Sequence, residues 1–432
     1  MLLYYIDLAR RSLRRNVSLT VLMIVAIAFG VGASMTTLTV LHVLAADPIP
    51  AKSSQLYYVQ LDARKADSYR PGDEPEDQMT RADAEALMRA HKAQRQALMT
   101  GGSAVVEPQQ PGLQPMMIDA RWTSRDIFPM FDIPFLAGAS WTEDDDRSGA
   151  RVVVITRSLA NKVFGSTDVI GKTMTVSSNP MRVVGVTDDW RPSPHFYDLN
   201  SDRFGAGEQA YVPWATAREL RLGRNGSMNC WGEHDDSEAV GAPCEWIQFW
   251  AELPTQEDAA AYKQFLISYS MAEKAAGRYQ RPPNVALRDV MEWLDYNKIV
   301  PSDAKLQAYL ALAFLIVCLV NTVGLLLTKF LRRAPEIGVR RALGASKRSI
   351  FAQLLIEAAI VGLVGGIIGL GLAWLGLWGV RHQPTDYADL AHLDVKMLAA
   401  TFAMAVVASI LAGILPAWRG CQIAPARQLK SH

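Results

Sequence analysis

Two acidic clusters are the parts of this chain whose residue types could bind a metal ion. Glu233-His234-Asp235-Asp236 and Asp144-Asp145-Asp146 carry side chains that ligate metals, but neither cluster pairs them at the spacing that a helix or a hairpin would supply. We therefore interpret both as solvated acidic loops. Because no Ser/His/Asp or Cys/His grouping stands out either, we expect no catalytic residue, cofactor site or metal site in this chain.

A third segment is similar to a phosphate-binding loop. Residues 165–173 read Gly-Ser-Thr-Asp-Val-Ile-Gly-Lys-Thr, but five residues separate the glycines where the motif needs four. The residues that follow alternate like a strand, whereas a phosphate-binding loop must open a helix. The segment is therefore predicted to be a turn without a nucleotide.

Four stretches of the chain contain no Asp, Glu, Lys or Arg. They are residues 16–46, 306–328, 358–380 and 397–418. Each supplies the roughly 20 apolar residues that a helix needs to cross a hydrocarbon core of about 30 Å, and in lipid such segments must be helical. The first stretch is about twice as long as the apolar region of a signal peptide, which favours an uncleaved anchor.

The distribution of charge predicts which parts face the cytosol. Short segments before the first span, between the second and third, and after the fourth carry 14 of the 44 basic residues. The long insert between the first and second spans has 28 Lys and Arg against 37 Asp and Glu. By the positive-inside rule, both termini face the cytosol and the insert faces outward.

These features predict an α+β membrane protein with one helix, a large mixed α/β domain of two subdomains, and then three helices. We expect an amphipathic interfacial helix at residues 1–16, spans at 17–46, 305–329, 349–380 and 397–418, the outer domain at 47–304, a cytosolic connection at 330–348, an outer loop at 381–396 and a cytosolic tail at 419–432. Within the outer domain we predict helices at 81–99 and 255–271, a strand at 151–156, a hairpin within 174–186, and long, poorly ordered loops over 192–245.

The four cysteines fit this topology. Cys230 and Cys244 fall in the outward domain, where an oxidising compartment would allow a disulfide, and two free thiols are the alternative. Cys318 and Cys421 lie in or near the membrane and are most simply free thiols.

The third span is rich in glycine. Gly362 with Gly366, and Gly365 with Gly369, are small-xxx-small pairs that let helices approach closely in lipid. Glu357, near the start of this span, could be a functional carboxylate or a member of a structural salt bridge.

The connection between the second and third spans has the most distinctive pattern. Pro335 and Glu336 suit the first turn of a helix, Gly344 would end it, and Ser346 could cap the next helix. Ile337, Arg340, Arg341 and Leu343 would make this short helix amphipathic. The residues alone leave two functions open: a lever that moves both spans, or a basic anchor on anionic lipid.

Two regions of the chain resemble the FtsX/MacB-type permease family. One runs from Arg332 to about Ala373 and continues in Leu-Ala-Gly-Ile-Leu-Pro-Ala-Trp-Arg at 411–419 and in Pro425. The other lies within residues 128–189 and resembles the periplasmic core domain of that family, with Phe-Leu-Ala-Gly at 135–138, Val-Val-Ile-Thr at 153–156, Ile-Gly-Lys-Thr at 170–173 and Val-Val-Gly-Val at 183–186.

The resemblance implies the permease subunit of a mechanotransmission-type ABC transporter in a bacterial inner membrane. A cytosolic ATPase dimer, which binds ATP and Mg²⁺, would grip the helix between the second and third spans and thereby move the periplasmic domain. No Walker motif occurs in this sequence, so we expect a separate ATPase chain. Carried over to this chain, the coupling residues are Glu336, Ile337, Arg340, Arg341, Leu343, Gly344 and Ala345.

Four spans resemble half of a membrane unit, so a second permease copy or paralogue is expected, and a periplasmic adaptor is a further expected partner. The implied cargo is a hydrophobic or amphipathic export substrate, such as an antibiotic, peptide, siderophore or lipoprotein. The alternative is an FtsX-like regulator, which transmits ATPase motion to a periplasmic hydrolase without moving cargo. Nucleic acid is not an expected partner.

Overall fold

The chain forms two compact units, residues 1–45 with 300–432 (the membrane unit) and residues 46–299 (the outer unit), in a computed structural model. The structure describes residues 8–9, 11–13, 15–110, 112–201, 203–383, 390 and 395–422. Much of the predicted interfacial helix at 1–16, most of the predicted loop at 381–396 and most of the predicted tail at 419–432 lie outside these residues.

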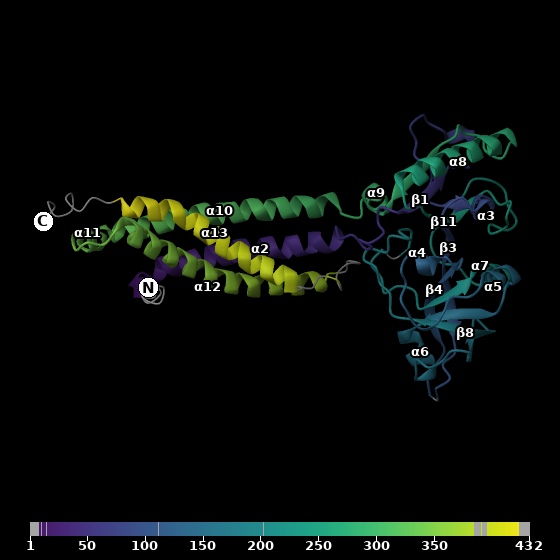
Figure 1. Cartoon of the computed structure of the whole chain (residues 1–432), viewed down its shortest axis with the longest axis horizontal. Helices are drawn as coiled ribbons and strands as arrows, with labels where there is room; N and C mark the ends of the chain where they lie inside the picture. Colours follow the sequence, from purple (N-terminus) through teal and green to yellow (C-terminus); the bar gives the residue numbers. More distant parts are fainter. Residues whose placement is uncertain are drawn as a thin grey trace. The chain divides into compact units, whose positions relative to one another are not determined.

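The described part of the membrane unit contains four helices that are long and apolar enough to cross a membrane. They are α2 (Val17–Leu44), α10 (Ser302–Arg332), α12 (Lys347–Arg381) and α13 (Val395–Cys421), and a short helix, α11 (Ala334–Ala342), joins α10 to α12. Figure 1 shows the four long helices side by side. At 1.5 Å per residue, the 31 residues of α10 extend over about 46 Å, so this helix is longer than a hydrocarbon core is thick.

The glycines of α12 face two different neighbouring helices. A Cβ added at Gly365 would lie 2.9 Å from Ile27 Cγ2, and one at Gly369 would lie 3.0 Å from the Ala28 carbonyl oxygen, both on α2. Gly362 and Gly366 instead face Ala405 on α13. The Gly365/Gly369 pair thus lets α2 approach closely, and the Gly362/Gly366 pair does the same for α13. Helix α12 therefore packs against both helices.

The outer unit is built on one twelve-stranded mixed sheet. Along its main path the strand order is β12-β1-β11-β3-β4-β9-β6-β8-β5, with β2 and β10 paired to β11 and β7 paired to β3 and β8. The strands are β1 (Leu56–Leu61), β2 (Met79–Thr80), β3 (Arg95–Val106), β4 (Met116–Thr123), β5 (Phe135–Gly138), β6 (Val152–Thr156), β7 (Thr173–Val176), β8 (Asn179–Thr187), β9 (Ala210–Pro213), β10 (Asn229–Cys230), β11 (Cys244–Glu252) and β12 (Val285–Asp289).

Helices pack on both halves of this sheet. They are η1 (Ala66–Ser68), α3 (Arg81–Ala90), α4 (Ile127–Met130), α5 (Glu143–Ser148), α6 (Arg157–Phe164), α7 (Trp214–Glu219), α8 (Gln256–Ala275) and α9 (Val290–Tyr296). Helix α8 lies against β12 and α3 against β11, whereas α6 lies against β6 and β8 (Figure 1). One hydrophobic cluster includes buried residues from strands at both ends of the sheet, so the two predicted subdomains share one sheet.

One prediction for the outer unit was wrong, and a second was confirmed in part. The helix predicted over 81–99 ends at Ala90, because His91 adopts a left-handed conformation (φ +48°) and the chain from Arg95 pairs as β3 with β4 and β11. The described part of 192–245 is largely loop, as predicted, but it also contains β9, α7 and β10, and Phe196 and Tyr197 are fully buried there among other aromatic rings. The burial of these rings holds in place part of a segment whose Gly, Asn and Asp content suggested disorder.

Three other predictions for this unit are confirmed. The run at 151–156 forms β6, and α8 begins at Gln256 as expected, although it continues to Ala275. The hairpin forms from β7 and β8, and its two turn residues, Ser177 and Ser178, both have positive φ. Two adjacent residues with positive φ are typical of the tight turns that match the twist of a hairpin.

Cys230 and Cys244 face each other across the β10–β11 ladder. Their sulfur atoms lie 2.06 Å apart, at bonding distance. Cys318 and Cys421, the other two cysteines, are buried free thiols. The disulfide therefore links the two-residue strand β10 covalently to β11.

The helix packing predicts that Gly365→Val destabilises the membrane unit, because its side chain would overlap Ile27 of α2. Overpacking of this kind costs about 1–3 kcal/mol. The thermal unfolding midpoint in detergent should fall. Gly371→Val is the matched control on the same helix, since nothing lies within 4 Å of a Cβ added at Gly371. Equal midpoints for the two variants would contradict this packing.

The disulfide predicts that Cys230 and Cys244 resist alkylation until a reductant is added. Denatured protein should then gain two labelled thiols upon reduction. In the chain-entropy model, closing a loop this short stabilises by about 3 kcal/mol, so Cys230→Ser with Cys244→Ser should unfold at lower temperature than wild type. Equal labelling of oxidised and reduced denatured protein would refute the bond.

Candidate functional site

The helix between the second and third spans is defined at both ends by its own sequence. In α11, Pro335 lies in the first turn, where its missing N–H leaves no unmade hydrogen bond. After the helix, Gly344 has φ +100°, and the N–H groups of Gly344 and Ala345 donate to the carbonyls of Arg341 and Arg340. This double hydrogen bond is a Schellman ending. The Ser346 hydroxyl then accepts from the Ser349 N–H and caps α12, as predicted.

Helix α11 has one buried face and one exposed apolar face. Ile337 is buried in the cluster that includes Phe330 and Leu354, so this face is held against the bundle. On the opposite side, Val339 is 57% exposed and Leu343 is 83% exposed. Because these two residues are four apart, their side chains lie together on one face.

Charged side chains fix α11 to the helices beside it. Glu336 accepts from Arg333 at 3.4 Å and from Arg340 at 2.8 Å, and Arg340 also donates to Gln353 of α12 at 3.0 Å. Partial burial acts to raise the pKa of Glu336, but the hydrogen bond and charge of Arg333, with the charge of Arg340, hold that pKa below its ordinary value. Glu336 is therefore ionised at neutral pH and holds both arginines.

Deeper in the same bundle, a buried carboxylate joins α12 to α10. Glu357 lies 2.6 Å from Lys329 Nζ and 3.0 Å from Arg333 Nη1, and it accepts from the Ser12 hydroxyl at 2.6 Å. The Glu357 and Lys329 side chains are fully buried. Removing charges from water costs several kcal/mol per ion, so such a cluster persists only when the charges stay together.

The structure thus separates the predicted coupling residues into groups. Glu336, Ile337 and Arg340 hold α11 to the bundle, and Ala345 packs partly buried beside the same cluster. Leu343 and Gly344 are exposed, and Arg341 is half-buried. Sequence reasoning missed Val339, whose spacing to Leu343 was a usable signal, and the partners of Glu357, which no local spacing indicates.

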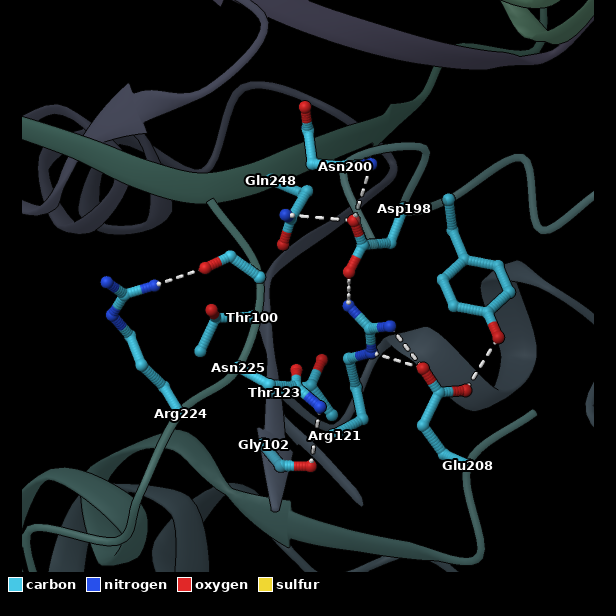
Figure 2. Close-up of polar contacts among 12 residues, drawn as sticks. Thr100, Gly102, Arg121, Thr123, Asp198, Asn200, Glu208, Arg224, Asn225 and Gln248 are labelled. Carbon is cyan, nitrogen blue, oxygen red and sulfur yellow. Dashed lines mark hydrogen bonds and ion pairs between the residues drawn. The ribbon is translucent and has the colours of Figure 1, made fainter. Parts of the chain in front are cut away.

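A second group of charges lies inside the outer unit (Figure 2). Arg121 of β4 donates to Asp198 at 2.8 Å and, through Nε, to Glu208 at 2.9 Å. Glu208 also accepts from the Tyr197 hydroxyl at 2.6 Å, and Gln248 of β11 donates to Asp198 at 3.2 Å. These contacts tie the 195–208 loop to two strands of the sheet.

The electrostatics of this group indicate a structural role. Burial acts to lower the pKa of Arg121, but the charges of Glu208 and Asp198 raise it overall. Burial likewise acts to raise the pKa of Glu208, but Arg121 lowers it overall. Arg121 and Glu208 therefore stay charged, and Arg121 donates to both carboxylates. A cavity of about 190 Å³ adjoins Arg121 and Glu208.

The segments with metal-binding or nucleotide-binding composition occupy ordinary structural positions. Asp145 forms a capping box with Thr142 at the start of α5, and Asp144 pairs with Arg147. The side chains of residues 233–236 are exposed. Thr173 begins strand β7, so residues 165–173 do not open a helix.

Another cavity, of about 260 Å³, lies where β2, β10 and β11 meet and is lined by Glu76, Asp77 and Glu245. Burial, reinforced by the charge of Glu76, raises the pKa of Asp77 above its ordinary value. The same two causes raise the pKa of Glu245 well above its ordinary value.

Comparison with known proteins assigns both parts of the chain. Residues 20–269 match the profile of the MacB-like periplasmic core domain, and residues 308–425 match that of the FtsX-like permease C-terminal region. The chain is 26% identical to the pyoverdine export ATP-binding/permease protein PvdT of Pseudomonas fluorescens over 316 residues, which cover 71% of this chain and 42% of the relative.

Other similar proteins point the same way. The macrolide export ATP-binding/permease protein MacB of Neisseria meningitidis is 23% identical over 292 residues, which cover 67% of this chain and 39% of the relative. The chain therefore spans about two fifths of the length of these relatives. Among solved structures, the periplasmic region of MacB from Actinobacillus actinomycetemcomitans aligns with a TM-score of 0.36 and 14% identity, covering 56% of this chain and 92% of that one.

The buried cluster predicts that Lys329→Met lowers the unfolding midpoint of the detergent-solubilised protein. Glu357 would lose one of its two cationic partners, and breaking a buried pair costs about 3–5 kcal/mol. Lys329→Met with Glu357→Met should recover part of the loss, because Arg333 keeps Glu336. Lys305→Met, at an exposed position on the same helix, is the control. If Lys329→Met and Lys305→Met unfold alike, the cluster contributes no stability.

Proposed function

The chain belongs to the family of membrane permeases with a MacB-like periplasmic core domain and an FtsX-like C-terminal region, and we propose that it is the permease subunit of a mechanotransmission-type ABC exporter. In this proposal a separate cytosolic ATPase dimer binds ATP and Mg²⁺ and docks on α11. Both termini face the cytosol, and the outer unit lies in the periplasm.

The two-sided character of α11 is the observation that carries the proposal. Its exposed face presents Val339 and Leu343 outside the spans, where a partner could cover them. Its other face is held by Ile337 and by the Glu336 ion pairs. A partner that grips the exposed face would therefore displace the buried face with it.

The buried ion pairs connect α11 to two of the membrane-spanning helices. Arg333 contacts both Glu336 of α11 and Glu357 of α12, and Lys329 of α10 contacts Glu357 as well. Movement of α11 would thus act on two spans together. Because α10 begins three residues after the outer unit ends, at Ser302, and α2 ends just before the outer unit begins, the spans can transmit motion to it along the chain.

The names of the relatives support a substrate class. Proteins similar to this chain are named for export of pyoverdine, syringafactin and macrolides, which supports a hydrophobic or amphipathic cargo such as an antibiotic, peptide, siderophore or lipoprotein. The other proposed partners are a second permease copy or paralogue and a periplasmic adaptor. The match of residues 20–269 to a MacB-like core domain favours export over the regulator of a periplasmic hydrolase.

Val339→Asp with Leu343→Asp should abolish coupling to the ATPase. Pull-down of tagged protein from its native membranes in mild detergent, followed by mass spectrometry, should recover a protein with Walker motifs from wild type. The double variant should recover it at least about tenfold less, because two carboxylates would be buried at an apolar contact.

Val339→Ile with Leu343→Met is the matched control, since it keeps the face apolar and should recover the ATPase as wild type does. Undiminished recovery with the aspartate pair would overturn the assignment of this face and leave a lipid anchor as the role of α11. Recovery of a cell-wall hydrolase alongside the ATPase would favour the regulator.

A further inference from the structure

One buried carboxylate in the outer unit has no hydrogen-bond partner among the described residues. Glu245, the second residue of β11, is 1% exposed, and neither of its carboxylate oxygens has a hydrogen-bond partner among the described residues. Other buried carboxylates of this unit each meet an arginine: Asp62 lies 3.1 Å from Arg281, and Asp198 lies 2.8 Å from Arg121. An ionised carboxylate without a counter-charge is strongly disfavoured in a protein interior, and a protonated one still needs hydrogen-bond partners.

Glu245 lines the cavity of about 260 Å³ together with other oxygen-bearing side chains. Two of these are the carboxylates of Glu76 and Asp77, and two are the amides of Asn200 and Asn229. Arg64 pairs with Glu76, and its charge also acts on Glu245. Asp77 receives one long hydrogen bond, from Gln60 at 3.4 Å. Three carboxylates thus line one cavity, and Glu245 is the one whose oxygen atoms accept no hydrogen bond among the described residues.

The sheet holds the walls of this cavity in register. Glu245 lies opposite Asn229 in the β10–β11 ladder and opposite Thr80 in the β11–β2 ladder. One residue before Glu245, the bond between Cys230 and Cys244 fixes β10 in place. Glu76 and Asp77 enter directly before β2. Residues from three separate segments thus line one cavity.

We propose that this cavity binds a divalent cation, and that the cation is Ca²⁺. Ca²⁺ takes six to eight oxygen ligands from carboxylates, amide carbonyls and water at about 2.3–2.6 Å, with flexible geometry. Zn²⁺ prefers nitrogen and sulfur, which these side chains do not offer as ligands. Since a water molecule occupies about 30 Å³ in the liquid, the cavity has room for the ion, several waters and the side-chain rotation that ligation requires.

Bound Ca²⁺ would supply the contact that the Glu245 oxygen atoms lack and would join β2, β10 and β11 through shared ligands. The proposal concerns the outer unit alone and does not depend on ATPase coupling. It predicts that Ca²⁺ raises the unfolding midpoint of the full chain in detergent relative to EDTA, and that titration calorimetry with CaCl₂ gives a saturable isotherm.

Glu245→Gln should lower the Ca²⁺ affinity by at least about tenfold, because ligand charge sets the affinity of such sites. In EDTA this variant should unfold no earlier than wild type, since the amide buries no charge. Glu233→Gln, in the exposed acidic loop of the same unit, is the matched control and should leave the isotherm unchanged. Asp77→Asn provides a second reading of the site if Glu245→Gln does not fold.

Two results would overturn the proposal. One is a wild-type protein whose unfolding midpoint is the same in Ca²⁺ and EDTA and which gives no isotherm at millimolar CaCl₂. The other is an isotherm that Glu245→Gln and Asp77→Asn leave unchanged. Either result would mean that Glu245 is buried in its protonated form.

Discussion

The membrane unit depends on one buried carboxylate. Glu357 sits among apolar side chains and is held by Lys329 and Arg333, two cations from the far end of another span. Because neither charge could remain there alone, the cluster fixes the distance between α10 and α12 at the level of α11. The position of the short helix, and hence of its exposed face, follows from this constraint.

Packing in the rest of the bundle uses a different means. In lipid, apolar helices gain no hydrophobic free energy when they associate, because lipid tails are as apolar as the helix surfaces. Small side chains let the helices approach closely and pack by van der Waals contact instead. The glycines of α12 provide it on two sides, toward Ile27 on α2 and toward Ala405 on α13. Close packing of the spans, with a charged cluster at one end, supports the proposed transmission of motion from α11.

The outer unit manages charge in a similar way, with one exception. Arg121 is buried with Asp198 and Glu208, and the three groups stabilise a long loop against the sheet. Glu245 lies in the same sheet and lacks such a partner. Because the ion group of Arg121 and the unsatisfied carboxylate of Glu245 occur in the same sheet, Glu245 is the residue that calls for an explanation.

The sequence by itself determined the features that depend on local composition. Charge-free stretches of about 20 residues predict spans because lipid offers no hydrogen bonds to the backbone, and Pro335, Gly344 and Ser346 define helix ends through their own backbone and side-chain chemistry. Strand β6 and the β7–β8 hairpin were predictable for the same reason. The helix expected over 81–99 failed because pairing with β4 and β11 outweighed local helical spacing.

Only the tertiary structure decided which charges meet. Lys329 and Arg333 are four residues apart at the end of α10, so the sequence places them on one face. Nothing in the sequence indicates that they meet Glu357, which lies on α12 and reaches them only because the two helices pack together. The same holds for Glu245, whose lack of a partner is visible only when every neighbouring element is in place. Long-range packing determines the environment of a buried charge, and a single sequence does not encode that packing in any local pattern.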